Sequence, residues 1–193
     1  MSDFSHAGGS VVPHQQGKQG WSTRKTVILA LFTALSLILS FVEFPIFPAA
    51  PFLKYDASAA VAAIAACGFG PAAGIIVGIA SAALHGLIMG DPWGSLMTAI
   101  VVVCWVLPLA LVYRTKNTRT MLVIGLAAGS LFSLAGAIGG NLLITPIYTG
   151  TPVEVVAAMI VPILLPFNAL KLLVNDVLVF VLAKPVQTIM DKR

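Results

Sequence analysis

Residues 121–143, MLVIGLAAGSLFSLAGAIGGNLL, contain no charged side chain in 23 positions. A helix that crosses the hydrocarbon core of a bilayer needs about 20 consecutive apolar residues. This stretch is therefore long enough and apolar enough to span a membrane. It predicts that the chain is an integral membrane protein.

The rest of the chain has the same character. Of its 193 residues, 59% are hydrophobic and only 9% are charged, whereas about 25% of the residues in a soluble domain carry a charge. About 165 residues follow the polar N-terminus, which is enough for about six crossings joined by short loops. We therefore predict one all-α domain with six transmembrane helices over residues 25–184, between a disordered cytoplasmic tail, 1–24, and a cytoplasmic C-terminal tail, 185–193.

Proline and glycine clusters divide the apolar sequence into helices. Three prolines exclude a helix from the segment EFPIFPAAPFLKYD, 43–56, and TPIYTGTP, 145–152, is predicted to be a loop. Pro162 and Pro166 predict a loop or a short amphipathic turn before the last helix. The predicted helices are 25–42, 57–67, 71–89, 95–113, 121–143 and a sixth within 153–183.

The distribution of charge gives an orientation. Nine of the eleven Lys and Arg residues lie in the N-terminal flank, the loop RTKNTR at 114–119, or the C-terminal flank. Positive residues accumulate on the cytoplasmic side, so we predict N-in, C-in topology in a bacterial-type cell membrane and need no nucleic-acid partner to explain the basic charge. The nine residues are Lys18, Arg24, Lys25, Arg114, Lys116, Arg119, Lys184, Lys192 and Arg193.

Polar residues interrupt the last apolar run. Asn168, Lys171 and Asn175 have the spacing that places side chains on one helical face, and a charge within the membrane is costly unless it is paired or lines a cavity. Asn141 lies at a comparable depth, followed by Thr145 and Tyr148 in the predicted loop. These residues predict a ligand site. The alternatives are that Lys171 reaches the surface or pairs with Asp176, and that Asn141 joins two helices.

Two further features concern surfaces. The first outer loop combines Lys54 and Asp56 with aromatic residues, which predicts either a lid over the site or an interfacial aromatic belt. Ala30 and Ala34 form a small-xxx-small pair, which favours close approach of another helix, either within the domain or from a partner. The aromatic residues of the loop are Phe44, Phe47, Phe52 and Tyr55.

Four sequence blocks, in order along the chain, carry a family resemblance. They are FPIFPAAPFLKYD (44–56), GFGPAAGIIVG (68–78), GNLLITPIY (140–148) and LPFNALKLLV (165–174). The chain resembles, over about residues 25–183, the riboflavin-specific substrate-binding S subunits (RibU type) of energy-coupling factor (ECF) vitamin importers. LKYD and PFNxxK are the most specific parts of this resemblance.

The resemblance implies an ECF S-component fold that binds riboflavin near the outer face as the transported ligand, with no cofactor. It also implies two kinds of partner. One is a transmembrane coupling protein (EcfT) that contacts Ala30 and Ala34, and the other is a pair of cytosolic ATPases. Many relatives carry an acidic residue and an Asn where this chain has Ser95 and Thr98. The predicted substrate-binding residues are Asn141, Asn168, Lys171, Leu53, Lys54, Asp56, Thr145, Tyr148 and Thr98.

Other functions fit the sequence less well. An S subunit for thiamine, biotin or folate would share the scaffold, but the LKYD and PFNALK blocks favour riboflavin. An intramembrane enzyme would need paired acids, a Ser/His pair or a metal cluster, and a channel would need a repeated polar lining. His85, the one histidine in the membrane part, is expected to be a packing or headgroup contact. The chain has no GxxxxGK loop, so we predict no ATPase activity in it.

Overall fold

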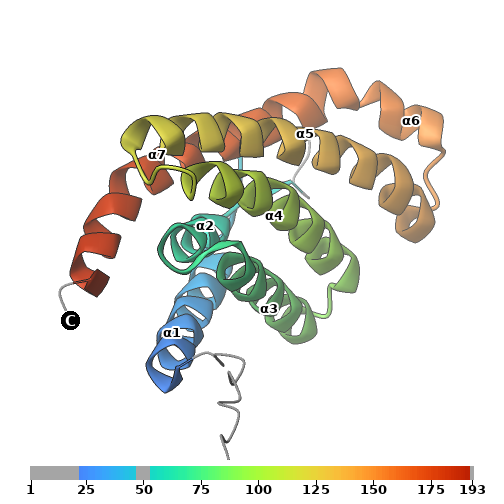
Figure 1. The fold of residues 1–193 in the computed structure, drawn as a ribbon. Helices are drawn as coiled ribbons and strands as arrows, with labels where there is room; N and C mark the ends of the chain where they lie inside the picture. The colour runs from blue at the N-terminus through green and yellow to red at the C-terminus, as the bar shows by residue number, and fades with distance from the viewer. Residues whose placement is uncertain (1–21, 47–52, 192–193) are drawn as a thin grey trace, which may run out of the picture.

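The computed structural model describes residues 22–46 and 53–191. Most of the predicted N-terminal tail, as well as Phe47 and Phe52 of the predicted lid, lies outside these residues. The described chain is almost entirely helical (Figure 1). Its elements are α1 (Thr23–Ser40), β1 (Phe44–Pro45), β2 (Lys54–Tyr55), α2 (Ser58–Phe69), α3 (Pro71–Met89), α4 (Pro92–Tyr113), α5 (Arg119–Thr149), α6 (Val153–Ala158), the π-helical turn η1 (Ile160–Leu164) and α7 (Leu165–Asp191).

The number of membrane-spanning helices agrees with the prediction. Within the described residues, five helical segments are long and apolar enough to cross a bilayer, and α2 is a shorter apolar helix. Together they make the expected six, so the prediction of an all-α, six-helix membrane protein is confirmed. The five long segments are Thr23–Ser40, Pro71–Met89, Pro92–Tyr113, Arg119–Thr149 and Ile160–Thr188.

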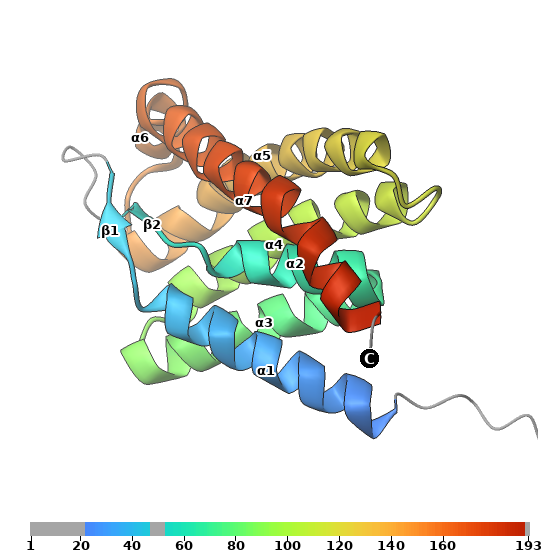
Figure 2. The ribbon, with the colours of Figure 1, turned by 90° about the vertical axis from the view of Figure 1, so that its left-hand side faces the viewer.

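Helix α2 is the centre of the bundle. It packs against α1, α3, α4 and α7, as Figure 2 shows, and ten of its twelve residues are buried. Twelve residues make a helix of about 18 Å, which is much shorter than the hydrocarbon core of about 30 Å. The short helix is possible because protein, rather than lipid, surrounds it.

Small residues allow the helices to approach closely. A Cβ at Gly74 of α3 would lie 2.4 Å from the Cβ of Ala66 in α2, and one at Gly129 of α5 would lie 2.5 Å from the carbonyl oxygen of Trp105 in α4. No side chain fits at either position. Close backbone contact of this kind replaces the hydrophobic driving force that is missing between helices in lipid.

The predicted loop at 145–152 is wrong over most of its length. Helix α5 continues through Pro146 to Thr149 and ends at Gly150, whose φ of +69° forms a left-handed C-cap. Proline removes one backbone donor, and this loss is tolerated within the last turn. Thr145 and Tyr148 therefore lie on a helix. In place of the loop or short amphipathic turn predicted before the last helix, the structure has the short helix α6 and the π-helical η1, with Pro162 inside η1 and Pro166 in the first turn of α7.

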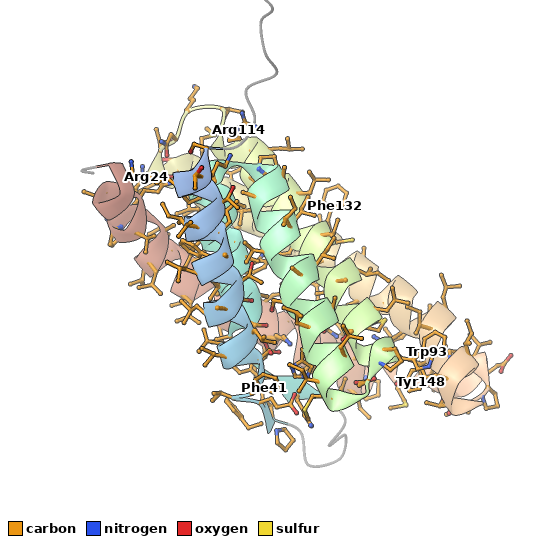
Figure 3. The ribbon with its side chains drawn as sticks, turned by 90° about the horizontal axis from the view of Figure 1, so that it is seen from below. Arg24, Phe41, Trp93, Arg114, Phe132 and Tyr148 are labelled. Atoms are coloured by element: carbon orange, nitrogen blue, oxygen red, sulfur yellow. The ribbon has the colours of Figure 1, made fainter. Side chains whose placement is uncertain are left out.

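The two ends of the bundle differ in character. Figure 3 shows Arg24 and Arg114 at one end, and Phe41, Trp93 and Tyr148 at the other. The start of α1 and the connection between α4 and α5 thus share one end, as an even number of crossings requires. The assignment of that end to the cytoplasm remains a prediction from the positive-inside rule.

Candidate functional site

A cavity of about 450 Å³ lies at the end of the bundle that is remote from Arg24 and Arg114. Ser58 and Ala59, the first residues of α2, line it together with residues from α1, α3, α4, α5, α7 and the β2 segment. The short α2 leaves this space, because it begins further inside the bundle than the ends of the longer helices around it (Figure 2). The volume falls within the range of about 300–1,000 Å³ that is typical of small-molecule sites.

Eight of the nine predicted substrate-binding residues line this one cavity. The ninth, Thr145, is not part of the lining but donates a hydrogen bond to Oδ1 of Asn141 at 3.1 Å. The chain segments that carry these residues are as many as 118 positions apart in the sequence, from Leu53 to Lys171. The eight are Asn141, Asn168, Lys171, Leu53, Lys54, Asp56, Tyr148 and Thr98.

An ion pair at the cavity joins the segment between α1 and α2 to the last helix, α7. Nζ of Lys171 lies 2.9 Å from Oδ2 of Asp56, and the two side chains are 18% and 15% exposed. Asp56 also accepts hydrogen bonds from the backbone N–H of Ser58 at 3.0 Å and from the Ser58 hydroxyl. The alternative pairing of Lys171 with Asp176 is therefore wrong. Lys54 pairs separately with Glu43.

The environment of Asp56 sets its charge. Burial on its own would raise the pKa of this carboxyl, but the Lys171 ammonium and the hydrogen bonds from Ser58 outweigh burial and hold the pKa below its ordinary value. Burial and the nearby Asp56 charge both raise the pKa of the neighbouring Tyr55 phenol. Tyr55 thus stays a hydrogen-bond donor while Asp56 stays ionised at neutral pH.

The two asparagines keep hydrogen-bonding capacity for a ligand. The amide groups of Asn141 and Asn168 each donate to the carbonyl four residues earlier, Ala137 and Leu164, both at 2.8 Å. Each amide retains a second N–H, and each carbonyl oxygen has a lone pair available. The bonds found for Asn141 lie within α5, which argues against the alternative that it joins two helices.

Asn175 belongs to the same helical face but has another role. Its side chain is 1% exposed, and Oδ1 accepts a hydrogen bond of 3.2 Å from the Tyr55 hydroxyl. Tyr55 follows Lys54 and precedes Asp56 in the sequence. This bond therefore anchors the loop segment that brings both charged residues to the cavity.

The remaining walls are largely apolar. Leu53, Met97, Val101, Val102 and Phe167 line the cavity between its polar groups. Apolar walls with a few convergent polar groups suit a flat ring system with a polar edge.

On the side of the cavity formed by α1, α3 and α4, only Thr98 was predicted from the sequence. Ser40, His85 and Ser95 line it, and the imidazole of His85 is stacked on Phe41 with ring centroids 5.1 Å apart. The sequence predicted only a packing or headgroup contact for His85. A signal was present, since Ser81 and His85 are four residues apart on α3 and Ser95 and Thr98 are three apart on α4, spacings that place polar side chains on one face.

Among the described residues, no group of three His, Cys, Asp or Glu side chains could hold a metal ion. The polar groups around the cavity are hydrogen-bond donors and acceptors and two ion pairs, Lys171–Asp56 and Lys54–Glu43. Their arrangement is suited to binding a small organic molecule.

Comparison with known proteins gives concordant results. Residues 24–183 match the family model described as "ECF transporter, substrate-specific component". The riboflavin transporter FmnP of Bacillus subtilis (strain 168) is 30% identical over 177 residues, which cover 84% of this chain and 93% of that protein. The riboflavin transporter RibU of Staphylococcus aureus (strain TCH60) is 29% identical over 109 residues, covering 56% of this chain and 58% of that protein, so the match spans less than two thirds of its length.

A solved structure supports the same relationship. The S component of a bacterial ECF transporter superposes with a TM-score of 0.75 at 27% identity, covering 88% of this chain and 98% of that one. The family model alone covers well over half of the chain. The protein is therefore a member of the family of substrate-specific components of ECF transporters.

Proposed function

We propose that this chain binds riboflavin in the cavity and serves as the substrate-binding S subunit of an ECF-type importer in the cell membrane. The observation that carries the proposal is one cavity of about 450 Å³ that combines Lys171, Asn168 and Asn141 with apolar walls. Two relatives named riboflavin transporters, at 29% and 30% identity, support the choice of ligand. Family membership also supports the expectation that the chain is a transport component rather than an enzyme.

The chemistry of riboflavin fits this cavity. Its isoalloxazine ring is a flat, largely apolar tricycle with carbonyl oxygens and one N–H at its edge, and its ribityl chain carries several hydroxyls. Lys171 supplies donors for carbonyl oxygens, while Asn168 and Asn141 supply both donors and acceptors. The apolar walls cover the faces of the ring.

Ligand identity can be tested with purified protein. Riboflavin copurified in detergent would colour the preparation yellow, and added riboflavin would lose fluorescence on binding to emptied protein. Thiamine, biotin and folate serve as competitors and represent the other vitamins considered. A colourless protein that leaves riboflavin fluorescence unchanged would overturn the assignment.

We propose further that transport is energised by separate subunits, a transmembrane coupling protein (EcfT) and two cytosolic ATPases. Ala30 and Ala34 lie one turn apart on α1 and are both exposed on the face turned away from the bundle. Small side chains there allow a partner helix to approach closely in lipid. This face is the proposed contact with the coupling protein.

Bulky residues on α1 would test this contact. Replacing Ala30 and Ala34 together by Trp should leave riboflavin binding in detergent unchanged and abolish uptake in cells. The matched control is Trp at Leu173 and Val177, which have the same spacing on α7 and are 61% and 55% exposed. Full uptake by the α1 variant, or equal loss in the control, would remove α1 from the proposed interface.

The orientation can be tested independently of the ligand. We expect a reporter at residue 117, in the loop RTKNTR, to face the cytoplasm, and one at residue 150, at the end of α5, to face outside. The opposite labelling pattern would reverse the topology and place the cavity on the inner side.

A further inference from the structure

The side of the cavity formed by Ser40, His85 and Ser95 has a definite hydrogen-bonding polarity. These three residues, here called the acceptor wall, come from the end of α1, the end of α3 and the start of α4. None of them belongs to the substrate-binding set predicted from the sequence. The number of protons that each can donate decides what this wall offers to a ligand.

The proton of Ser40 is already used. Its hydroxyl donates to the carbonyl oxygen of Leu37 at 2.7 Å, and its Oγ also lies 2.8 Å from Nδ1 of His85. A serine hydroxyl has only one proton to donate, so Nδ1 of His85 must be the donor in the second bond. A neutral imidazole carries one N–H, and Nε2 is therefore a bare acceptor. No described residue forms a hydrogen bond with Nε2.

The proton of Ser95 is also used. Its hydroxyl donates to the carbonyl oxygen of Ala82 at 2.7 Å, which leaves its lone pairs unused. Next to this wall, the carboxylate of Asp91 accepts a bond from the N–H of Gly94 at 2.9 Å and has no proton to give. The wall thus presents lone pairs rather than protons to the cavity.

The opposite side of the cavity has the reverse character. Lys171 carries an ammonium group there, and Asn168 and Asn141 each retain an amide N–H. The ammonium group has three protons, of which the carboxylate of Asp56 uses one. A ligand that spans the cavity therefore meets donors at the α5 and α7 side and acceptors at the α1 and α3 side.

We propose that the acceptor wall binds the hydroxyl-rich end of the ligand, with Nε2 of His85 accepting a hydrogen bond from a ribityl hydroxyl. The carbonyl edge of the isoalloxazine ring then faces Lys171 and the asparagines. This assignment rests on riboflavin being the ligand, and it makes His85 a residue that selects for the polyol chain. The stacked Phe41 and the bond to Ser40 hold the imidazole in the required orientation.

The test compares two flavins that differ only in the chain. Lumiflavin has the same ring as riboflavin but a methyl group in place of ribityl. In the variant His85→Phe, which keeps an aromatic ring beside Phe41 but has no acceptor, riboflavin should bind about tenfold more weakly. Lumiflavin should bind within about twofold of its affinity for the unaltered protein, and its retained binding shows that the variant is folded.

A matched control and a second variant complete the experiment. Leu87→Phe introduces the same ring two residues away on α3, at a side chain that is 80% exposed and outside the cavity lining, and should change neither affinity. If His85→Phe binds neither flavin, Ser95→Ala decides, because it removes an acceptor of the same wall and should weaken riboflavin alone.

The outcomes separate this inference from the proposed function. The variant to be judged is His85→Phe or, if it binds neither flavin, Ser95→Ala. If that variant loses equal affinity for riboflavin and lumiflavin, or keeps its full affinity for riboflavin, the acceptor wall does not bind the ribityl chain, and riboflavin remains the ligand. If the unaltered protein quenches neither riboflavin nor lumiflavin, the proposed function fails and the inference fails with it.

Discussion

Helix α7 carries two polar clusters only five residues apart. In the first, Lys171 pairs with Asp56 at 2.9 Å. In the second, the carboxylate of Asp176 accepts hydrogen bonds from Nε1 of Trp105 at 3.1 Å and from the Ser130 hydroxyl at 2.7 Å. Both clusters place a charged side chain in an apolar run. Only the first lines the cavity.

The two clusters differ in how many hydrogen-bond donors and acceptors remain free for a ligand after the bonds within the protein are formed. Lys171 has three protons, of which Asp56 takes one. Both oxygens of Asp176 have donors, one from α4 and one from α5, and the residue lies outside the cavity lining. A polar group with spare capacity beside a cavity can bind a ligand, whereas one whose partners are all within the protein joins helices.

The largest expected effect is on the first cluster. The variant Lys171→Met should weaken riboflavin binding by about 2 kcal/mol, roughly thirtyfold, because it removes a charged donor and leaves Asp56 without its partner. Fluorescence quenching in detergent measures the affinity. The control Lys184→Met makes the same change on α7, at a residue that bonds to Asn117 and lies outside the cavity. Equal loss in both variants would mean that the effect is not specific to the cavity.

A substitution in the second cluster should lower stability and leave riboflavin affinity almost unchanged. The variant Asp176→Leu should lower the free energy of unfolding by about 1 kcal/mol, since it leaves the Trp105 and Ser130 donors without an acceptor. Riboflavin affinity should stay within about twofold of normal. Thermal unfolding in detergent and quenching give the two measurements, with Val177→Leu as the neighbouring control on the exposed face of α7. A large loss of affinity at intact stability would make Asp176 part of the ligand site.

The sequence predicted which polar residues of α7 share a helical face, but not the partners of Lys171 and Asp176. The spacing of Asn168, Lys171 and Asn175 was sufficient to place them on one face of a helix. It could not identify Asp56 as the partner of Lys171, because that residue lies 115 positions earlier and only the folded bundle brings them together. Asp176, next to Asn175 in the sequence, was the nearer candidate. Its actual partners, Trp105 and Ser130, are also distant in sequence.

The fold was predictable to a similar extent. Length and hydropathy gave six helices and their order, since each helix must cross the same apolar layer. They did not give the continuation of α5 through Pro146, because the tolerance for a missing backbone donor depends on the surrounding structure. Nor did they bring Ser40, His85 and Ser95 together, because the spacings on α3 and α4 show which side chains share a helical face but not that three helices place them at one cavity.

Tyr55 offers an intermediate case between the two clusters. Its hydroxyl bonds to the buried Asn175 rather than to the cavity, yet it holds the loop that carries Asp56. Tyr55→Phe should lower the free energy of unfolding by about 0.5–1 kcal/mol and speed riboflavin dissociation about threefold. Tyr113→Phe removes an equivalent bond, to Gln187 at 2.8 Å, away from the cavity. It should affect stability alone, and faster dissociation in this control would contradict the role given to the loop.

The smallest expected effect is that of mild acidification on the Lys171–Asp56 pair. Because the pKa of Asp56 is lower in the folded protein than in the unfolded chain, its contribution to stability is complete above the unfolded value of about 3.9 and is lost only as the pH falls through the folded value. The difference in unfolding free energy between the unaltered protein and Asp56→Asn should therefore stay constant from about pH 8 to about pH 5 and shrink below about pH 4. Groups that titrate equally in both proteins cancel in this difference between the two unfolding free energies. A difference that instead grows as the pH falls from about 7 to about 5 would mean that burial outweighs the ammonium of Lys171 and raises the pKa of Asp56. Asp56 would then be protonated and uncharged at the lower pH. The first cluster would differ from the second only in lining the cavity.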